Sequence, residues 1–154
     1  MRAAHFATVS GNLDALRVLL KAGAIYDAIT AQGSTCLMTA CMTDAPPPTC
    51  VAMAQALLDA GADPLIEDRG GELALHHAED QGNPNMIDVL LKAKGSSLSK
   101  KMLSHVSKWG HTPLQSALEN DQEQAVAHLL SLGARATVDR EGRGKFAPAG
   151  GYEE

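Results

Sequence analysis

The stretch "LLKAGA" at Leu19–Ala24 is repeated, with small changes, three more times along the chain. The related stretches are "LLDAGAD" at 57–63, "LLKAKG" at 90–95 and "LLSLGA" at 129–134. Their first leucines are separated by 38, 33 and 39 residues. Recurrence at this spacing is typical of a stacked array of similar units rather than of one closed globule.

Each copy predicts a helix that ends at a glycine and is followed by an extended segment. In the first copy the leucines recur every three or four residues, which places them on one helix face. These leucines are Leu13, Leu16, Leu19 and Leu20. Gly23 suits the left-handed residue that closes a helix. Residues 24–33 then alternate loosely and finish on Gly33, which indicates a turn-bearing finger rather than more helix.

The clearest helix start is "GHTPLQSAL" at 110–118. Thr112 is a good N-cap, and Pro113 is well suited to the first helical position because it has no N–H to leave unpaired. Gln115 stands three residues after Thr112, where it can complete a capping box. This boundary therefore follows from local chemistry.

The same slot is filled in each copy by a related tetrapeptide: "RAAH" at 2–5, "TCLM" at 35–38, "LALH" at 73–76 and "TPLQ" at 112–115. Three copies also keep a second-helix pattern, seen in "GNLDALRVLLKAGA", "GNPNMIDVLLKAKG" and "DQEQAVAHLLSLGA". In these features the chain resembles an ankyrin repeat protein. The resemblance implies an all-α solenoid of about four stacked helix-turn-helix units with projecting, hairpin-like fingers.

The predicted ankyrin repeat domain covers residues 1–144, with units at about 1–24, 25–63, 64–95 and 96–135 and a partial finger at 136–144. A glycine-rich tail occupies 145–154. Two insertions interrupt the pattern: a proline-rich one at 44–48, expected to project as a loop dispensable for folding, and one at 94–109 with a short helical turn at 101–105. The chain is either a short stand-alone array or a piece of a longer protein.

Composition restricts the class of partner. The chain has 154 residues, 45% of them hydrophobic and 20% charged, with a formal net charge of −5. A net negative charge disfavours nucleic acid as a partner, and no apolar run reaches the length that direct membrane insertion requires. The three cysteines, Cys36, Cys41 and Cys50, fit neither a disulfide framework nor a zinc motif and indicate reduced thiols. An intracellular, cytoplasmic location is favoured, and the nucleus or another organelle stays open.

The sequence predicts no catalytic, metal or cofactor site. No Ser-His-Asp order, phosphate-binding loop or carboxylate pair stands beside a base. His5 and His76 occupy the histidine position of the family motif, where the resemblance implies a turn-fixing hydrogen bond. His77 follows at a more exposed position and could contact a partner. A zinc-dependent enzyme using the cysteines is the remaining alternative, and it would require tightly bound metal.

Trp109, the only tryptophan, is predicted beside a finger tip. "SKWG" at 107–110 stands where the family pattern has Asp-x-x-Gly. A large amphipathic ring there is a natural binding anchor. The alternative is that the ring folds back and covers its own loop.

We therefore predict a non-catalytic module that binds an unidentified partner protein through its finger tips and concave helix face. The alternative is a structural subunit embedded permanently in a larger assembly. The family resemblance implies the following partner-contacting positions: Ala31, Gln32, Ser34, Arg69, Gly70, Glu72, His77, Asp80, Gln81, Lys108, Trp109, His111, Glu119 and Asn120.

Overall fold

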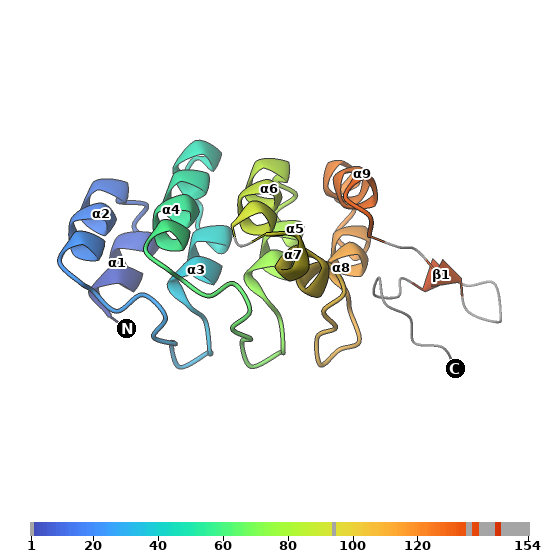
Figure 1. Cartoon of the computed structure of the whole chain (residues 1–154), viewed down its shortest axis with the longest axis horizontal. Coiled ribbons are helices and arrows are strands. Elements are labelled where there is room, and N and C mark those ends of the chain that lie inside the picture. Colours follow the sequence, from blue (N-terminus) through green and yellow to red (C-terminus); the bar gives the residue numbers. More distant parts are fainter. Residues whose placement is uncertain (1, 94, 135–136, 139–143, 146–154) are drawn as a thin grey trace.

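The computed structural model describes residues 2–93, 95–134, 137–138 and 144–145. It is a row of helix pairs joined by long fingers that project to one side (Figure 1). The elements are α1 (Ala3–Val9), α2 (Leu13–Lys21), α3 (Cys36–Met42), α4 (Pro47–Asp59), α5 (Ala74–Asp80), α6 (Pro84–Lys92), α7 (Ser96–Leu103), α8 (Pro113–Glu119), α9 (Glu123–Ser131), β1 (Thr137–Val138) and β2 (Gly144–Lys145).

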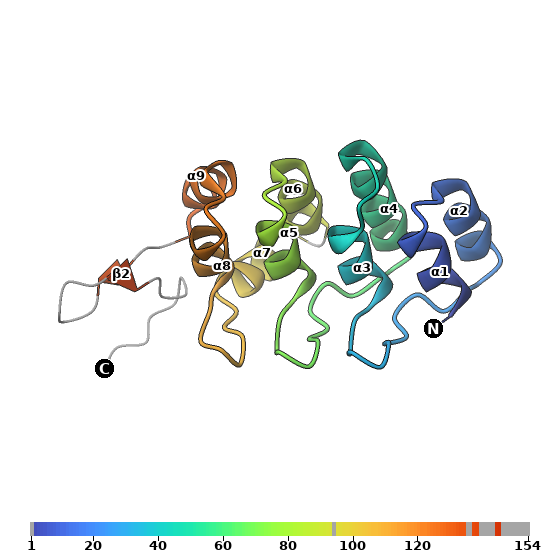
Figure 2. The same ribbon diagram turned by 180° about the vertical axis from the view of Figure 1, so that it is seen from behind.

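The helices form two layers. The inner helices α1, α3, α5 and α8 contact one another in sequence, and the outer helices α2, α4, α6 and α9 do the same. Figures 1 and 2 show both layers and, beneath the inner helices, three fingers. We refer to these as finger 1 (24–34), finger 2 (62–72) and finger 3 (105–111). The predicted all-α solenoid is confirmed.

The core runs continuously along the stack between the two layers. Its fully buried large side chains are Leu16, Leu37, Met38, Met53, Leu57, Leu73, Leu75, Ile87, Leu90, Met102, Leu114 and Leu129. Leucine and small alanines dominate, and methionine contributes as well, through Met38, Met53 and Met102. Its flexible, unbranched side chain can fill irregular gaps where successive units of unequal length meet.

The inner helices begin where the tetrapeptide alignment places them. Their N-caps are Arg2, Thr35, Leu73 and Thr112. The Thr112 hydroxyl accepts a hydrogen bond from the Gln115 backbone N–H at 3.3 Å, and Pro113 is the first helical residue. The predicted alignment of the four inner helices is therefore confirmed.

A tight left-handed turn joins the two helices of three units. Gly11, Gly82 and Asp121 occupy it, with φ values of 67°, 65° and 54°. Glycine adopts this conformation freely, and aspartate is among the few other residues that tolerate it. They are the first residues of the three second-helix stretches quoted from the sequence.

The proline-rich insertion at 44–48 does not project as a free loop. Helix α4 begins at Pro47, with Pro46 as its N-cap, because the first turn of a helix needs no N–H from proline. As a result α4 has 13 residues, whereas α2 has nine. Ala45 is packed against the first unit: a Cβ added at Gly11 would lie 2.9 Å from its Cβ. The expectation that this insertion projects as a loop is wrong. The packing of Ala45 also argues against the expectation that the insertion is dispensable for folding.

The second insertion holds a full helix instead of the predicted turn at 101–105. Helix α7 spans Ser96–Leu103 and contacts α6 and α8, with Met102 and Leu103 buried. The Ser99 hydroxyl donates to the Leu91 carbonyl, which joins α7 to the end of α6. The helix therefore starts earlier than the sequence indicated and is docked on the array.

Beyond α9, β1 and β2 form one antiparallel pair in which Thr137 is opposite Lys145. The predicted partial finger at 136–144 includes Asp139 and Gly142, and these two residues lie outside the described residues, as does the tail from 146 onward. Among the helices that the structure describes, none combines the length and apolarity needed to cross a membrane.

Candidate recognition face

The three fingers end in the same closed turn. In each, the backbone N–H of the first turn residue donates to the carbonyl four residues later, at 2.9–3.0 Å. The pairs are Thr30 with Ser34, Asp68 with Glu72, and Ser107 with His111. In finger 3 the Ser107 hydroxyl accepts N–H bonds from Trp109 and His111, both at 3.3 Å. Serine thus replaces the aspartate of the family pattern.

Adjacent fingers are in direct contact. The Lys108 backbone N–H donates to the Gly70 carbonyl at 2.8 Å, and the Lys108 ammonium donates to the Arg69 carbonyl at 2.8 Å. A Cβ added at Gly33 would lie 2.9 Å from the Arg69 backbone nitrogen, so only glycine allows fingers 1 and 2 to approach this closely. The finger tips therefore form one continuous row.

Trp109 is 70% exposed at the tip of finger 3. Its indole nitrogen leans toward finger 2, where a Cβ added at Gly70 would lie 3.1 Å from it. The alternative in which the ring is enclosed by its own loop is therefore wrong. Most of the aromatic surface is open to a partner.

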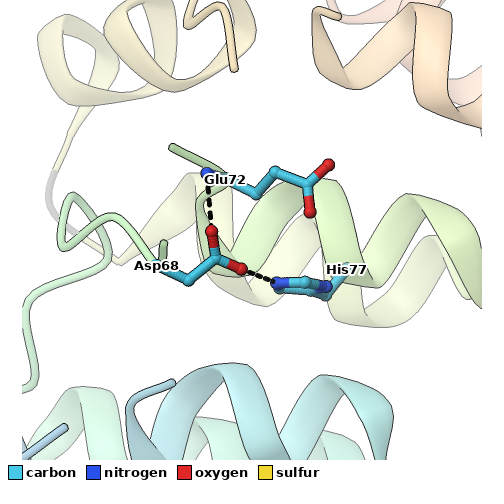
Figure 3. A group of neighbouring side chains, drawn as sticks. All are labelled: Asp68, Glu72 and His77. Atoms are coloured by element: carbon cyan, nitrogen blue, oxygen red, sulfur yellow. Dashed lines mark hydrogen bonds and ion pairs between the residues drawn. The ribbon is translucent and has the colours of Figure 1, made fainter. Parts of the chain in front are cut away.

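Finger 2 is fixed to its helix by Asp68. One carboxylate oxygen accepts N–H bonds from Gly70 and Glu72, at 2.8 and 3.0 Å, and the other lies 2.9 Å from His77 Nε2 (Figure 3). Asp68, Glu72 and His77 place donor atoms within 4.8 Å of one another, and these are atom types that bind divalent cations. The hydrogen bonds of Asp68 already account for its position, so we assign this group a structural role.

His77 is more exposed than His76, as predicted, but its side chain retains only 12% of its accessible surface. The contact with Asp68 holds the ring against the finger. This contact could not be predicted from the sequence, because the two residues lie nine positions apart across the finger turn.

Buried histidines join the first and third units to the finger that follows each of them. His76 Nδ1 accepts the Leu73 backbone N–H at 3.1 Å, so Nε2 carries the proton and donates to the His111 carbonyl at 3.2 Å. Burial lowers the pKa of His76 to about 4, which keeps the ring neutral. His5 Nε2 lies 3.2 Å from the Ser34 carbonyl, although its Nδ1 has no hydrogen-bond partner among the described residues, and Met38 fills this slot in the second unit. The predicted turn-fixing role of the two histidines is confirmed.

The inner helices present equivalent side chains beside the fingers. In the aligned units one exposed or half-buried column reads Val9, Met42, Asp80 and Glu119. Only Asp80 and Glu119 were predicted as contact residues. Val9 and Met42 were missed, although the same alignment places them in this column. Phe6, one helical turn before Val9, was missed as well and is exposed.

The acidic end of this column is crowded. Burial raises the pKa of Asp80, His77 lowers it, and the nearby carboxylates of Glu72 and Glu119 raise it further. Asn120 donates to Asp80 at 2.8 Å, and His111 lies 3.2 Å from Glu119. The face therefore has a local excess of negative charge over α5 and α8.

None of the fourteen predicted contact residues is buried. Eight are exposed: Ala31, Gln32, Arg69, Gln81, Lys108, Trp109, Glu119 and Asn120. Six are half-buried: Ser34, Gly70, Glu72, His77, Asp80 and His111. All lie on the fingers or at the exposed side of the inner helices, and we call this surface, together with Phe6, Val9 and Met42, the recognition face.

The three cysteines lie in the core, away from this face. All are free thiols and buried. Burial raises the pKa of Cys36 to about 11 and also raises the pKa values of Cys41 and Cys50. Thiols that stay protonated are poor nucleophiles and poor metal ligands.

Comparison with known proteins agrees with this architecture. Residues 49–140 match the family model described as "Ankyrin repeats (3 copies)". Inversin from Gallus gallus is 32% identical over 142 residues, which are 92% of this chain and 12% of that protein. NF-kappa-B inhibitor alpha from Sus scrofa is 37% identical over 82 residues, which are 53% of this chain and 26% of that protein.

Among solved structures, the crystal structure of the ankyrin repeat domain of Bcl-3 is similar, with a TM-score of 0.76 and 29% sequence identity. The match covers 89% of this chain and 59% of that domain. Of the two curated relatives, inversin and NF-kappa-B inhibitor alpha, the chain spans only a small part of the length.

Proposed function

Because this chain belongs to the ankyrin repeat family, we propose that it is a non-catalytic module that binds a partner protein through its recognition face. Ankyrin repeats are generally protein-interaction modules. The observation that carries the proposal is the continuous row of fingers beside exposed inner-helix side chains, because an extended surface of this kind suits another chain better than a small molecule. One relative, NF-kappa-B inhibitor alpha, is named for its action on another protein.

The fourteen predicted positions, together with the three that the structure adds, are the contacts that we propose. The partner itself should be identified by affinity capture and mass spectrometry. We propose an intracellular, cytoplasmic location, which the three unpaired cysteines favour.

Trp109→Ala should weaken partner binding by about 2 kcal/mol or more, roughly thirtyfold, because an exposed aromatic at a finger tip is the strongest anchor on this face. The thermal melt should change by less than about 1 kcal/mol, since the ring is largely exposed. Titration calorimetry with the captured partner measures the first quantity, and thermal denaturation measures the second.

Val18→Ala is the matched control, because Val18 is 66% exposed on the outer helix α2. It should change neither binding nor stability. In the protein without its partner, the fluorescence of Trp109 should also resemble that of indole in water and should be quenched readily by iodide. A blue-shifted, protected emission, or unchanged affinity in Trp109→Ala, would contradict its role as an anchor.

A permanently embedded subunit is the second candidate function, and one observation favours it. Apolar side chains are exposed at both ends of the described array: Val18 on α2 with Ile25 and Ile29 on finger 1, and Leu130 and Leu132 at the last helix. Surfaces of this kind are often covered in an assembly. Sedimentation of the isolated chain separates the two: a stable monomer supports the reversible module, and concentration-dependent aggregation supports the subunit.

A further inference from the structure

The recognition face changes chemical character along its length. Over α1 and α3 its largest exposed side chains are apolar: Phe6 at 61%, Val9 at 50% and Met42 at 39%. Val9 and Met42 are the large apolar side chains of a groove between the two helices, whose other lining residues are Ser10, Gly11, Thr39, Thr43, Asp44 and Ala45. Apolar groups gathered in a groove favour burial by a partner over continued exposure.

Over α5 and α8 the same positions are acidic. Asp80 and Glu119 replace the apolar pair, and Glu72 lies close enough to Asp80 to raise the pKa of that carboxyl. None of the inner helices α1, α3, α5 and α8 contains a lysine or an arginine. The basic side chains Arg69 and Lys108 stand on the fingers instead, and the Lys108 ammonium is already bonded to a finger carbonyl.

From this division we infer that the recognition face binds a protein segment with apolar side chains at one end and lysine or arginine at the other. The apolar end lies over α1 and α3, and the basic end lies over Asp80 and Glu119. This inference rests on the proposed function and adds the chemistry and the direction of the partner. Opposite charges across the interface select the partner and fix its register, and the apolar contacts supply affinity.

An acidic segment is the competing occupant, because it could pair with Arg69 and Lys108. It would have to pass beside the carboxylates of Glu72, Asp80 and Glu119 on the inner helices. Like charges placed together at an interface oppose binding, so the acidic segment is disfavoured.

The test begins with a random peptide library displayed on phage and selected against the whole immobilised chain. We expect the selected peptides to carry an apolar cluster and a basic cluster at separate ends. A selection dominated by acidic peptides that still require Trp109 would overturn this inference and leave the proposed function standing. A selection that yields no binder to the face would contradict the proposed function itself.

Variants then locate each end of a selected peptide by fluorescence anisotropy. Asp80→Asn with Glu119→Gln removes charge and keeps shape, and it should lower affinity about tenfold and abolish the salt dependence of binding. Val9→Thr with Met42→Gln keeps shape and removes apolar surface, and it should lower affinity about as much without changing the salt dependence.

Asp59→Asn with Glu123→Gln is the control, because it removes the same number of charges from the outer helices α4 and α9. It should leave binding unchanged. Equal effects of the acidic-face pair and this control would show that only net charge matters and would overturn the inference. A peptide whose orientation is reversed, with its basic end sensitive to the Val9 and Met42 changes, would overturn it as well.

Discussion

Replacing Leu57 or Leu90 by alanine should lower the free energy of unfolding by about 2–5 kcal/mol. Both side chains are fully buried between the two helix layers. Removing three carbon atoms there takes away buried apolar surface and leaves a cavity that neighbouring units can fill only in part. Urea denaturation followed by circular dichroism gives the two free energies directly.

Leu130→Ala is the matched control. Leu130 follows Leu129 in the same repeated pair, but it is 46% exposed because no further helix pair packs on α9 among the described residues. The control should lose less than about 1 kcal/mol. If all three variants unfolded alike, the placement of the leucines between the layers would be wrong.

Glu79→Gln should raise the free energy of unfolding at pH 7 by about 3 kcal/mol. Glu79 is fully buried, and neither carboxyl oxygen has a hydrogen-bond partner among the described residues. Burial, with a further contribution from Asp80, raises its pKa from 4.5 to about 9. The unfolded chain can ionise this group at pH 7 whereas the folded array keeps it protonated, so ionisation favours unfolding.

The direction of the pH dependence follows from two groups. Stability from Glu79 is complete below pH 4.5 and is lost as the pH rises to about 9. His76 acts oppositely, because its pKa falls from 6.5 to about 4, so stability is lost as the pH drops through that range. Between pH 4.5 and 6.5 the two groups change the free energy of unfolding in opposite directions as the pH rises. Above pH 6.5 only the loss of stability caused by Glu79 continues.

We therefore expect the wild-type chain to be most stable in weakly acidic solution and to weaken steadily between pH 6.5 and 9. Chemical denaturation at a series of pH values measures this profile. Glu79→Gln should flatten its alkaline side, whereas the exposed Glu123→Gln should not. A wild-type profile that is already flat above pH 6.5 would show that Glu79 finds a partner or water on folding.

The repeat could be predicted from sequence because its signals are local. N-caps such as Thr35 and Thr112, and the turn residues Gly11 and Asp121, act through neighbours within four positions, so the sequence alone defines them. The place of Trp109 beside a finger tip follows similarly from the finger alignment, whereas its exposure was left open between two alternatives and is decided by the structure. The solenoid then results from stacking units that cannot bury their apolar faces alone.

Other features depended on contacts between distant segments. Pro47 can end one helix or begin another, and the contact of Ala45 with the first unit determines the outcome. The helix α7 is stabilised by docking Met102 on its neighbours rather than by a strong cap. Glu79 occupies a buried position where Cys41 stands in the preceding unit, and a single sequence gives no warning of a carboxyl group there.

The histidine bridges are also distributed unevenly along the array. His5 ties the first unit to finger 1, and His76 ties the third unit to finger 3, but Met38 makes no such bond from the second unit to finger 2. The same boundary carries the buried acid Glu79 beside Cys41. This boundary is therefore held by the packing of α3 on α5 and of α4 on α6, without a histidine bond to the finger. A bound chain that spans α1–α4 and α5–α9 would add the polar link across this boundary that the second unit does not supply.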